Sequence, residues 1–182
     1  MQFWNNPFFW AFLATIGWGL GFLVVGSKTF GKNTFFGVFV VALAEIPRII
    51  LPLPFISQPR FGDGVILPII GFIVLIVALA FGTPAFLIKP FTRPQKEEKL
   101  RTTGLYSVVR HPIYFCDSFW PLGLSLIFSS LIGTVLVVLW FLLAYLLTFL
   151  EEEKLIEEYG DEYLKYRERV PRIIPFLKYI GL

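Results

Sequence analysis

The chain has 182 residues, of which 56% are hydrophobic and only 16% are charged, with a mean hydropathy of +0.72. Ordinary soluble domains are about 45–50% apolar and about 25% charged, so this composition excludes a disordered tail, a secreted disulfide scaffold and a typical cytosolic enzyme. One cysteine and one histidine exclude an internal disulfide and a Cys- or His-rich metal site, and no metal is expected. The net charge of +3 is small, so the placement of the charges is more informative than their sum.

Long apolar runs predict membrane-spanning helices, each of which needs about 20 mostly apolar residues. The clear runs cover residues 8–26, 65–88, 113–128 and 131–150. A further run, residues 34–56, is interrupted by Glu45 and Arg48 and ends in a group of prolines, which predicts either a kinked span or a segment that dips into the membrane and returns. We therefore expect an all-α integral membrane protein of about five transmembrane helices, forming a single membrane domain over residues 1–182.

Positive charges are distributed unevenly over the predicted loops. Of the 16 Lys and Arg residues, all except Arg48 and Arg60 fall in the loops after the first and third spans and in the C-terminal tail. Cytoplasmic loops carry an excess of Lys and Arg, so residues 89–110 and 151–182 are predicted to be cytoplasmic. Five spans would place the N-terminus outside. If residues 34–56 enter the membrane and return without crossing it, the N-terminus is inside, and residues 89–110 and 151–182 remain cytoplasmic.

The last two spans predict a helical hairpin that brings the polar segments on either side of it close together. Residues 151–169 are predicted to continue the last span as an amphipathic helix, because apolar and aromatic residues recur in them at helical spacing. Gly160 weakens the middle of this helix, and Pro171 and Pro175 end it. The apolar residues that follow are expected in the headgroup region: Phe176, Leu177, Tyr179 and Ile180.

Three polar clusters on the predicted cytoplasmic side are the candidates for chemistry, and the third is residues 169–175, which two prolines make rigid. Arg110 and His111 precede Pro112, which suits the first turn of a helix, and a helix N-terminus favours an anionic group. Glu151, Glu152 and Glu153 stand at a helix C-terminus, where the macrodipole prefers cations, so we expect them to have cationic or hydroxyl-bearing partners. The structural alternatives are interfacial anchoring for the first cluster and an exposed acidic face for the second.

These residues stand in an order that resembles the membrane methyltransferase superfamily, which contains the isoprenylcysteine carboxyl methyltransferases and the phospholipid N-methyltransferases. The resemblance covers residues 100–177 and rests on Gly104, Tyr106, Arg110, His111, Pro112, Tyr114, Glu151, Glu152, Leu155, Tyr159, Gly160, Tyr163, Tyr166, Val170, Pro171 and Pro175. It identifies residues 91–182 as the methyltransferase core. Residues 1–90 lie in a variable helical part, where we expect substrate choice to be determined.

The resemblance implies an S-adenosylmethionine-dependent methyltransferase that acts on a lipid or lipophilic acceptor, either a prenylcysteine carboxylate or a phospholipid amine. It implies that the cofactor binds at the cytoplasmic ends of the last two helices, held by Gly104, Tyr106, Arg110, His111, Pro112, Tyr114, Glu151 and Glu152. Arg172 or Arg169 matches a basic position near the reacting end of the acceptor. Membrane lipids are expected partners and nucleic acid is not, while the oligomeric state stays open.

Charged residues within the predicted spans bear on the acceptor. Methyl transfer is a displacement at carbon that needs proximity, alignment and a dry pocket. A carboxylate acceptor needs no base, whereas an amine must lose a proton, and Asp117 and His111 are the candidate acceptors of that proton. Many family members have a small residue near Asp117, so this departure leaves the acceptor type open. Glu45 and Arg48 share one helical face and predict either a structural ion pair or a substrate-headgroup site.

Two other functional classes share parts of this pattern. NADPH-dependent membrane sterol and steroid reductases have a similar Arg-His-Pro segment and tail, but they usually contain more helices and lack the glutamate pair at the helix exit. A non-enzymatic membrane protein gives no reason for carboxylates at that position. The short chain and the pair Glu151 and Glu152 favour the methyltransferase.

Overall fold

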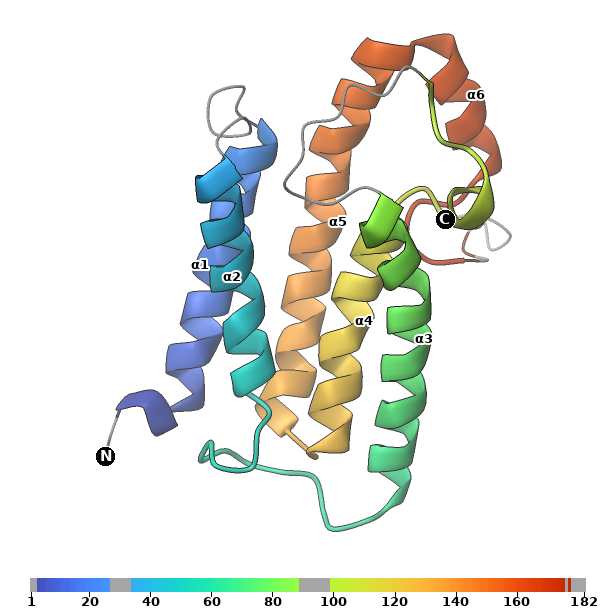
Figure 1. Cartoon of the computed structure of the whole chain (residues 1–182). Coiled ribbons are helices and arrows are strands. Elements are labelled where there is room, and N and C mark those ends of the chain that lie inside the picture. The colour runs from blue at the N-terminus through green and yellow to red at the C-terminus, as the bar shows by residue number, and fades with distance from the viewer. Residues whose placement is uncertain (1–2, 27–33, 89–98, 176, 178–182) are drawn as a thin grey trace.

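The computed structural model describes residues 3–26, 34–88, 99–175 and 177. Five long helices run side by side in a bundle (Figure 1): α1 (Pro7–Gly26), α2 (Thr34–Ile50), α3 (Ile66–Ile88), α4 (Pro112–Ile127) and α5 (Leu131–Tyr159). Short 3-10 helices, η1 (Phe3–Asn5) and η3 (Gly104–Ser107), precede α1 and α4, and α6 (Asp161–Arg169) follows α5. Over the described residues, the prediction of an all-helical fold is confirmed.

Three of these helices, α1, α3 and α5, are long and apolar enough to cross a membrane. Helices α2 and α4 have only 17 and 16 residues, so the five-span count stays a prediction. Helix α3 displays a broad face of exposed apolar side chains, as expected of a surface that meets lipid. These side chains are Ile66, Ile69, Ile70, Phe72, Ile73, Ile76, Val77 and Leu79.

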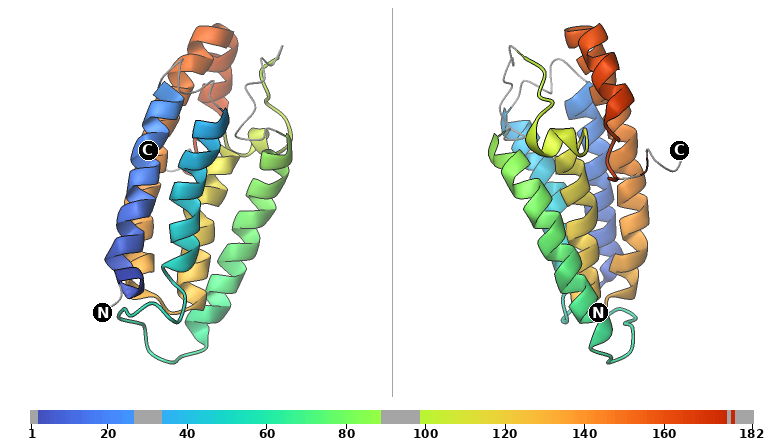
Figure 2. Two further views of the ribbon diagram at one scale, coloured as in Figure 1. Left: turned by 60° about the vertical axis from the view of Figure 1, so that its left-hand side comes forward. Right: turned by 90° about the vertical axis from the view of Figure 1, so that its right-hand side faces the viewer.

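The helices pack in the order α3–α4–α5–α1–α2 around the bundle (Figure 2). Two of these contacts bring backbones together, because they are made at glycines. A Cβ added at Gly17 of α1 would lie 2.4 Å from the backbone nitrogen of Ala44 in α2. A Cβ added at Gly71 of α3 would lie 2.6 Å from the backbone oxygen of Gly123 in α4. Substitution at either glycine would therefore push two helices apart.

The predicted hairpin between α4 and α5 is confirmed, and Arg60 anchors it. Ser129 adopts a positive φ of 52°, and the Ser130 side chain caps α5 by accepting a hydrogen bond from the Gly133 backbone N–H. Arg60, on the connection from α2 to α3, donates hydrogen bonds to the backbone carbonyls of Pro52, Leu53, Ile56 and Phe128. A single side chain thus ties that connection to the end of α4.

At the opposite end, α5 continues past its apolar run and then reverses into α6 (Figure 1). The prediction of one helix over residues 151–169 is wrong at Gly160, whose φ of 55° ends α5 and starts the turn. The predicted amphipathic character is nevertheless present in α6, because its Tyr163 and Tyr166 are buried against apolar residues of α5. Of the predicted interfacial residues, Phe176, Tyr179 and Ile180 lie outside the described residues, as do residues 27–33 and 89–98.

Candidate functional site

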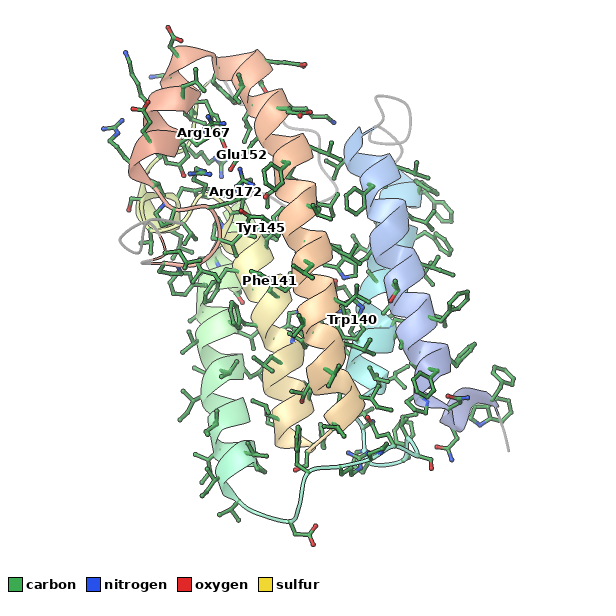
Figure 3. The ribbon with its side chains drawn as sticks, turned by 180° about the vertical axis from the view of Figure 1, so that it is seen from behind. Trp140, Phe141, Tyr145, Glu152, Arg167 and Arg172 are labelled. Atoms are coloured by element: carbon green, nitrogen blue, oxygen red, sulfur yellow. The ribbon has the colours of Figure 1, made fainter. Side chains whose placement is uncertain are left out.

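Three segments far apart in sequence meet where α4 begins (Figure 3). Pro112 occupies the first turn of α4, and His111 is its N-cap residue. The backbone N–H groups of Arg110 and His111 donate to the carbonyls of Pro171 and Arg172 at 2.8 and 2.9 Å. These two hydrogen bonds hold the chain after α6 against the start of α4, and both segments face the end of α5. The predicted proximity of the two polar segments is confirmed for their described residues.

Glu152 is the centre of this site, with a side chain that is only 3% exposed. Its Oε1 accepts from Nη2 and Nε of Arg110 at 2.8 and 3.0 Å, and its Oε2 accepts from Nη2 of Arg172 at 2.9 Å. His111 Nε2 lies 3.2 Å from the same Oε1. A buried carboxylate is tolerated when cations and hydrogen bonds surround it, so Glu152 holds these three side chains in one place.

Glu151 lies beside Glu152 and is more accessible, with a side chain 34% exposed. Its Oε1 accepts a hydrogen bond from the Tyr114 hydroxyl at 2.9 Å, and its Oε2 lies 3.4 Å from His111 Nδ1. Burial acts to lower the pKa of His111, but Glu151 and Glu152 outweigh it, so the pKa of His111 is raised above its ordinary value. A protonated imidazole donates from both ring nitrogens, which matches the carboxylate on each side of it.

Arg172 connects the site to an aromatic wall on α5. Its guanidinium carbon lies 3.8 Å from the ring centre of Phe149 and 5.2 Å from that of Tyr145, within the range of cation–π attraction. Its Nη1 is buried and has no hydrogen-bond partner among the described residues. A cavity of about 290 Å³ lies against Arg110, Tyr145 and Arg172, on the side of α5 seen in Figure 3.

Helix α6 covers the site through its aromatic side chains. Tyr166 donates from its hydroxyl to the backbone carbonyl of Tyr106 at 2.6 Å, which fixes η3 against α6. Burial raises the pKa of both Tyr163 and Tyr166, so both hydroxyls stay protonated. The buried Tyr163 hydroxyl lies near Glu152, so the cover also contacts the centre of the site.

The structure brings together most of the residues that the sequence singled out. Arg110, His111, Tyr114, Glu151, Glu152 and Arg172 form one connected network, and the buried Pro112 sets its geometry. Tyr106 is linked to the cover through its backbone. Gly104 has a positive φ of 63° in open space, and no contact of it with the glutamates is described. Arg169 is exposed and donates to Lys165 of its own helix, away from the network.

A second ionic cluster lies inside the bundle, and sequence reasoning found only half of it. Nη1 of Arg48 donates to Glu45 at 2.8 Å, which is the expected ion pair on one helical face. The same Nη1 also donates to Asp117 of α4 at 2.9 Å. Asp117, proposed from sequence as a proton acceptor, is thus held by an arginine of another helix. The signal that could have found this contact is the charge count, because two carboxylates and one arginine occur within the apolar runs.

Comparison with known proteins gives a consistent family. The family model described as phospholipid methyltransferase matches residues 61–162. Protein-S-isoprenylcysteine O-methyltransferase B of Arabidopsis thaliana is 29% identical over 163 residues, 87% of this chain and 82% of that protein. The Schizosaccharomyces pombe protein-S-isoprenylcysteine O-methyltransferase is 35% identical over 88 residues, 47% of this chain. The cobalt-zinc-cadmium resistance protein CzcN of Cupriavidus metallidurans is 34% identical over 83 residues, 46% of this chain.

The matched segments cover only 37% of the Schizosaccharomyces pombe protein and 38% of CzcN, so the chain spans well under two thirds of these two relatives. No solved structure is significantly similar to the chain. The family model nevertheless covers more than half of the chain and includes both Arg110 and Glu152. The chain belongs to the phospholipid methyltransferase family.

Proposed function

We propose that this protein is an S-adenosylmethionine-dependent methyltransferase that acts on a lipophilic acceptor in the membrane. The observation that carries the proposal is the buried carboxylate of Glu152, surrounded by Arg110, His111 and Arg172 at the ends of two apolar helices. Family membership supports methyl transfer, as do the names of several relatives. The comparisons give no support to the NADPH-dependent reductase alternative.

The residues of the site fit the proposed cofactor. S-adenosylmethionine carries a cationic amino group, a sulfonium, ribose hydroxyls and a carboxylate, and it supplies an electrophilic methyl carbon when bound. Glu151 and Glu152 suit its cationic and hydroxyl groups, while Arg110, His111 and the start of α4 suit its carboxylate. The buried donor at Arg172 Nη1, which has no hydrogen-bond partner among the described residues, is further support for a ligand here.

The network also indicates how a ligand would be accommodated. Glu152 already accepts hydrogen bonds from its neighbours, so a ligand must exchange with some of those bonds rather than add to them. The Glu151 side chain is 34% exposed and that of Glu152 only 3%, so Glu151 is the more accessible carboxylate. We therefore infer that the ligand first contacts Glu151, whereas Glu152 holds Arg110 and Arg172 in position.

A lipophilic acceptor has a place next to this site. An apolar cavity of about 440 Å³ within the bundle is lined in part by Ile113 and Tyr114, and Tyr114 also hydrogen-bonds Glu151. An acceptor in the cavity would have its reacting end near Tyr114, with Arg172 as the basic residue on the other side of the network. The isoprenylcysteine names of several relatives favour a prenylcysteine carboxylate over a phospholipid amine. A carboxylate needs no base, which suits a histidine that is held between two glutamates.

All five long helices cross the membrane in this proposal, and the end that carries the site faces the cytoplasm. The unequal distribution of Lys and Arg supports this orientation. Single cysteines introduced by Ser107→Cys and Glu157→Cys, on a background without Cys116, should resist an impermeant maleimide added to intact cells. The matched control Asp63→Cys, on the connection between α2 and α3, should be labelled. Efficient labelling of the first two positions would overturn the orientation.

Methyl transfer is tested with purified protein in lipid nanodiscs and labelled S-adenosylmethionine. The two acceptors are N-acetyl-S-farnesylcysteine and phosphatidylethanolamine, and a parallel reaction contains NADPH in place of S-adenosylmethionine. We expect a base-labile methyl ester on farnesylcysteine and no dependence on NADPH. If only the phospholipid is labelled, the acceptor is a phospholipid amine and not a prenylcysteine carboxylate. Binding of NADPH without binding of S-adenosylmethionine would overturn the proposed function.

A further inference from the structure

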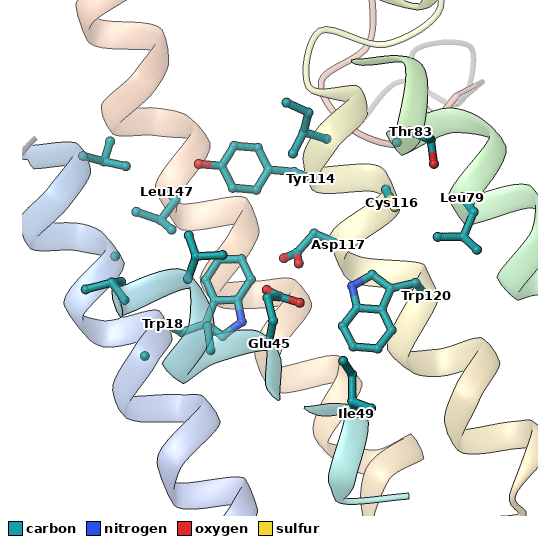
Figure 4. A pocket seen from close by; sticks show the side chains of 18 residues that line it. Trp18, Glu45, Ile49, Leu79, Thr83, Tyr114, Cys116, Asp117, Trp120 and Leu147 are labelled. Carbon is teal, nitrogen blue, oxygen red and sulfur yellow. The ribbon is translucent and has the colours of Figure 1, made fainter. Parts of the chain in front are cut away.

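The apolar cavity has an acidic patch in its wall. The cavity lies among all five long helices, and most of its lining is aliphatic or aromatic (Figure 4). Glu45 reaches it from α2 and Asp117 reaches it from α4, and the two carboxylates lie close together in Figure 4. A charged side chain within a membrane-spanning helix is costly, so a pair of them in the wall of an apolar cavity calls for an explanation.

The arginine that neutralises this patch is hidden behind it. Arg48 has a fully buried side chain, and its guanidinium carbon lies 5.5, 5.1 and 5.4 Å from the ring centres of Trp18, Trp120 and Trp140. Its Nη1 donates to both carboxylates, and its Nη2 donates to the backbone carbonyl of Asp117. Arg48 is absent from the cavity lining as far as the described residues define it. A molecule in the cavity therefore meets the carboxylates, whereas the cation is enclosed by tryptophan.

The cluster leaves hydrogen-bonding capacity unused on the cavity side. Two carboxylates share one guanidinium, so the cluster carries either an excess negative charge or a shared proton. The Glu45 carboxyl interacts with the side chains of Asp117 and Trp120, while Asp117 Oδ2 is buried and has no hydrogen-bond donor in range among the described residues. Trp18 lines the same cavity, is only 6% exposed, and has a buried Nε1 that also lacks a described partner. Buried polar atoms are rarely left unsatisfied in native proteins, so the acceptor Asp117 Oδ2 points to a donor on whatever fills the cavity, and the donor Trp18 Nε1 points to an acceptor on it.

We propose that Glu45 and Asp117 form a specificity site that recognises a hydrogen-bond donor on a lipophilic ligand, such as a hydroxyl, an amine or an amide N–H. The inference rests on the proposed function in one respect, because it takes the ligand to be the methyl acceptor. Asp117 lies one helical turn below Tyr114, a rise of about 4.5 Å. The recognised donor is therefore distinct from the reacting group and lies about one turn further toward the tail of the acceptor. A plain hydrocarbon at that position would leave Asp117 Oδ2 without a donor.

Three tritiated probes of equal chain length test this site: 1-dodecanol, dodecylamine and 1-methoxydodecane. The first two carry a donor and the ether carries none. Binding is measured with the protein in nanodiscs without S-adenosylmethionine, and partition into empty nanodiscs is subtracted. A hydrogen bond to a charged group corresponds to roughly a ten- to hundredfold preference for a donor-bearing probe over the ether. Preference for the alcohol would identify a neutral donor, and preference for the amine would identify a cation. Equal binding of all three probes would overturn the proposal.

Variants locate the preference in the carboxylates. Asp117→Asn and Glu45→Gln keep the side-chain shapes, and each leaves Arg48 one carboxylate partner. Each should reduce the donor preference at least several-fold, whereas Glu153→Gln, an exposed position on α5, should retain it. Thermal unfolding is recorded for each variant, and the comparison among probes on the parent protein stands even if a variant does not fold. Full retention of the preference in Asp117→Asn would contradict the assignment.

This experiment is independent of the proposed function. The binding assay contains no S-adenosylmethionine and measures no turnover. Failure of the parent protein to bind S-adenosylmethionine would overturn the methyltransferase proposal while leaving the donor preference measurable. Equal binding of the three probes by a protein that does bind S-adenosylmethionine would overturn only the specificity site.

Discussion

The two ionic clusters of this molecule have opposite charge balance and different surroundings. The outer cluster sets Arg110, His111 and Arg172 against two glutamates at the ends of the helices. The inner cluster sets one arginine against two carboxylates within the bundle and encloses that arginine with tryptophan rings. In the proposed function, the outer cluster exchanges some of these contacts with a charged, water-soluble ligand. The inner cluster has an enclosed cation, and its two carboxylates reach the cavity wall.

The largest expected effect comes from removing the cation of the inner cluster. Arg48→Met leaves Glu45 and Asp117 together in an apolar interior, and breaking a buried ion pair in this way costs about 3–5 kcal/mol. The variant should unfold at a clearly lower temperature than the parent protein in the same detergent. Adding Glu45→Gln and Asp117→Asn to Arg48→Met should recover part of the loss. If Arg48→Met were as stable as the parent protein, the inner cluster would not stabilise the fold.

Removing the central carboxylate of the outer cluster should destabilise the protein less. Glu152→Gln keeps the shape of the side chain but weakens its hydrogen bonds from Arg110, His111 and Arg172, with an expected loss of about 1–3 kcal/mol. These cations lie near the end of the bundle and can recruit water, which Arg48 cannot. Thermal unfolding in the absence of ligand checks the difference, with the exposed Glu153→Gln as control. Equal losses in Arg48→Met and Glu152→Gln would remove the contrast between the clusters.

Helix packing around the inner cluster provides a sharper test of its rigidity. Gly17→Ala places a methyl group against the backbone of Ala44 and should cost about 1–3 kcal/mol, because the helices that hold Trp18 near Arg48 must separate. Gly19→Ala is the matched control on the same helix, where a Cβ meets nothing within 4 Å. The donor preference of the cavity should weaken in the first variant alone. Identical behaviour of the two variants would show that close packing of α1 and α2 does not matter.

The smallest expected effect is a pH dependence confined to the outer cluster. The pKa of His111 is raised in the folded protein by Glu151 and Glu152, so its contribution to stability is complete below the unfolded pKa of about 6.5 and is lost as the pH rises through the folded value. Unfolding temperatures measured from about pH 6 to about pH 9 should therefore fall more steeply in the parent than in His111→Gln. Parallel profiles would show that His111 is not protonated between the two glutamates.

The sequence predicted the outer cluster better than the inner one for a physical reason. The outer residues lie at the ends of a short hairpin, so chain connectivity alone brings Arg110 close to Glu152. The contact between Arg48 and Asp117 depends on the rotation of α2 and α4 about their axes, which no local pattern specifies. The break at Gly160 was also missed, because a glycine within a periodic pattern is compatible with both a continuous helix and a left-handed turn.

Calorimetric titration of S-adenosylmethionine into the protein in nanodiscs tests the central claim most directly. The parent protein should bind the cofactor without NADPH or a metal ion. Glu151→Gln and Glu152→Gln should each bind it roughly ten- to hundredfold more weakly, since each loses a charge-assisted hydrogen bond, while Glu153→Gln should match the parent. Parental affinity in both glutamate variants would contradict the assignment of the outer cluster, and absence of binding by the parent protein would contradict the proposed function.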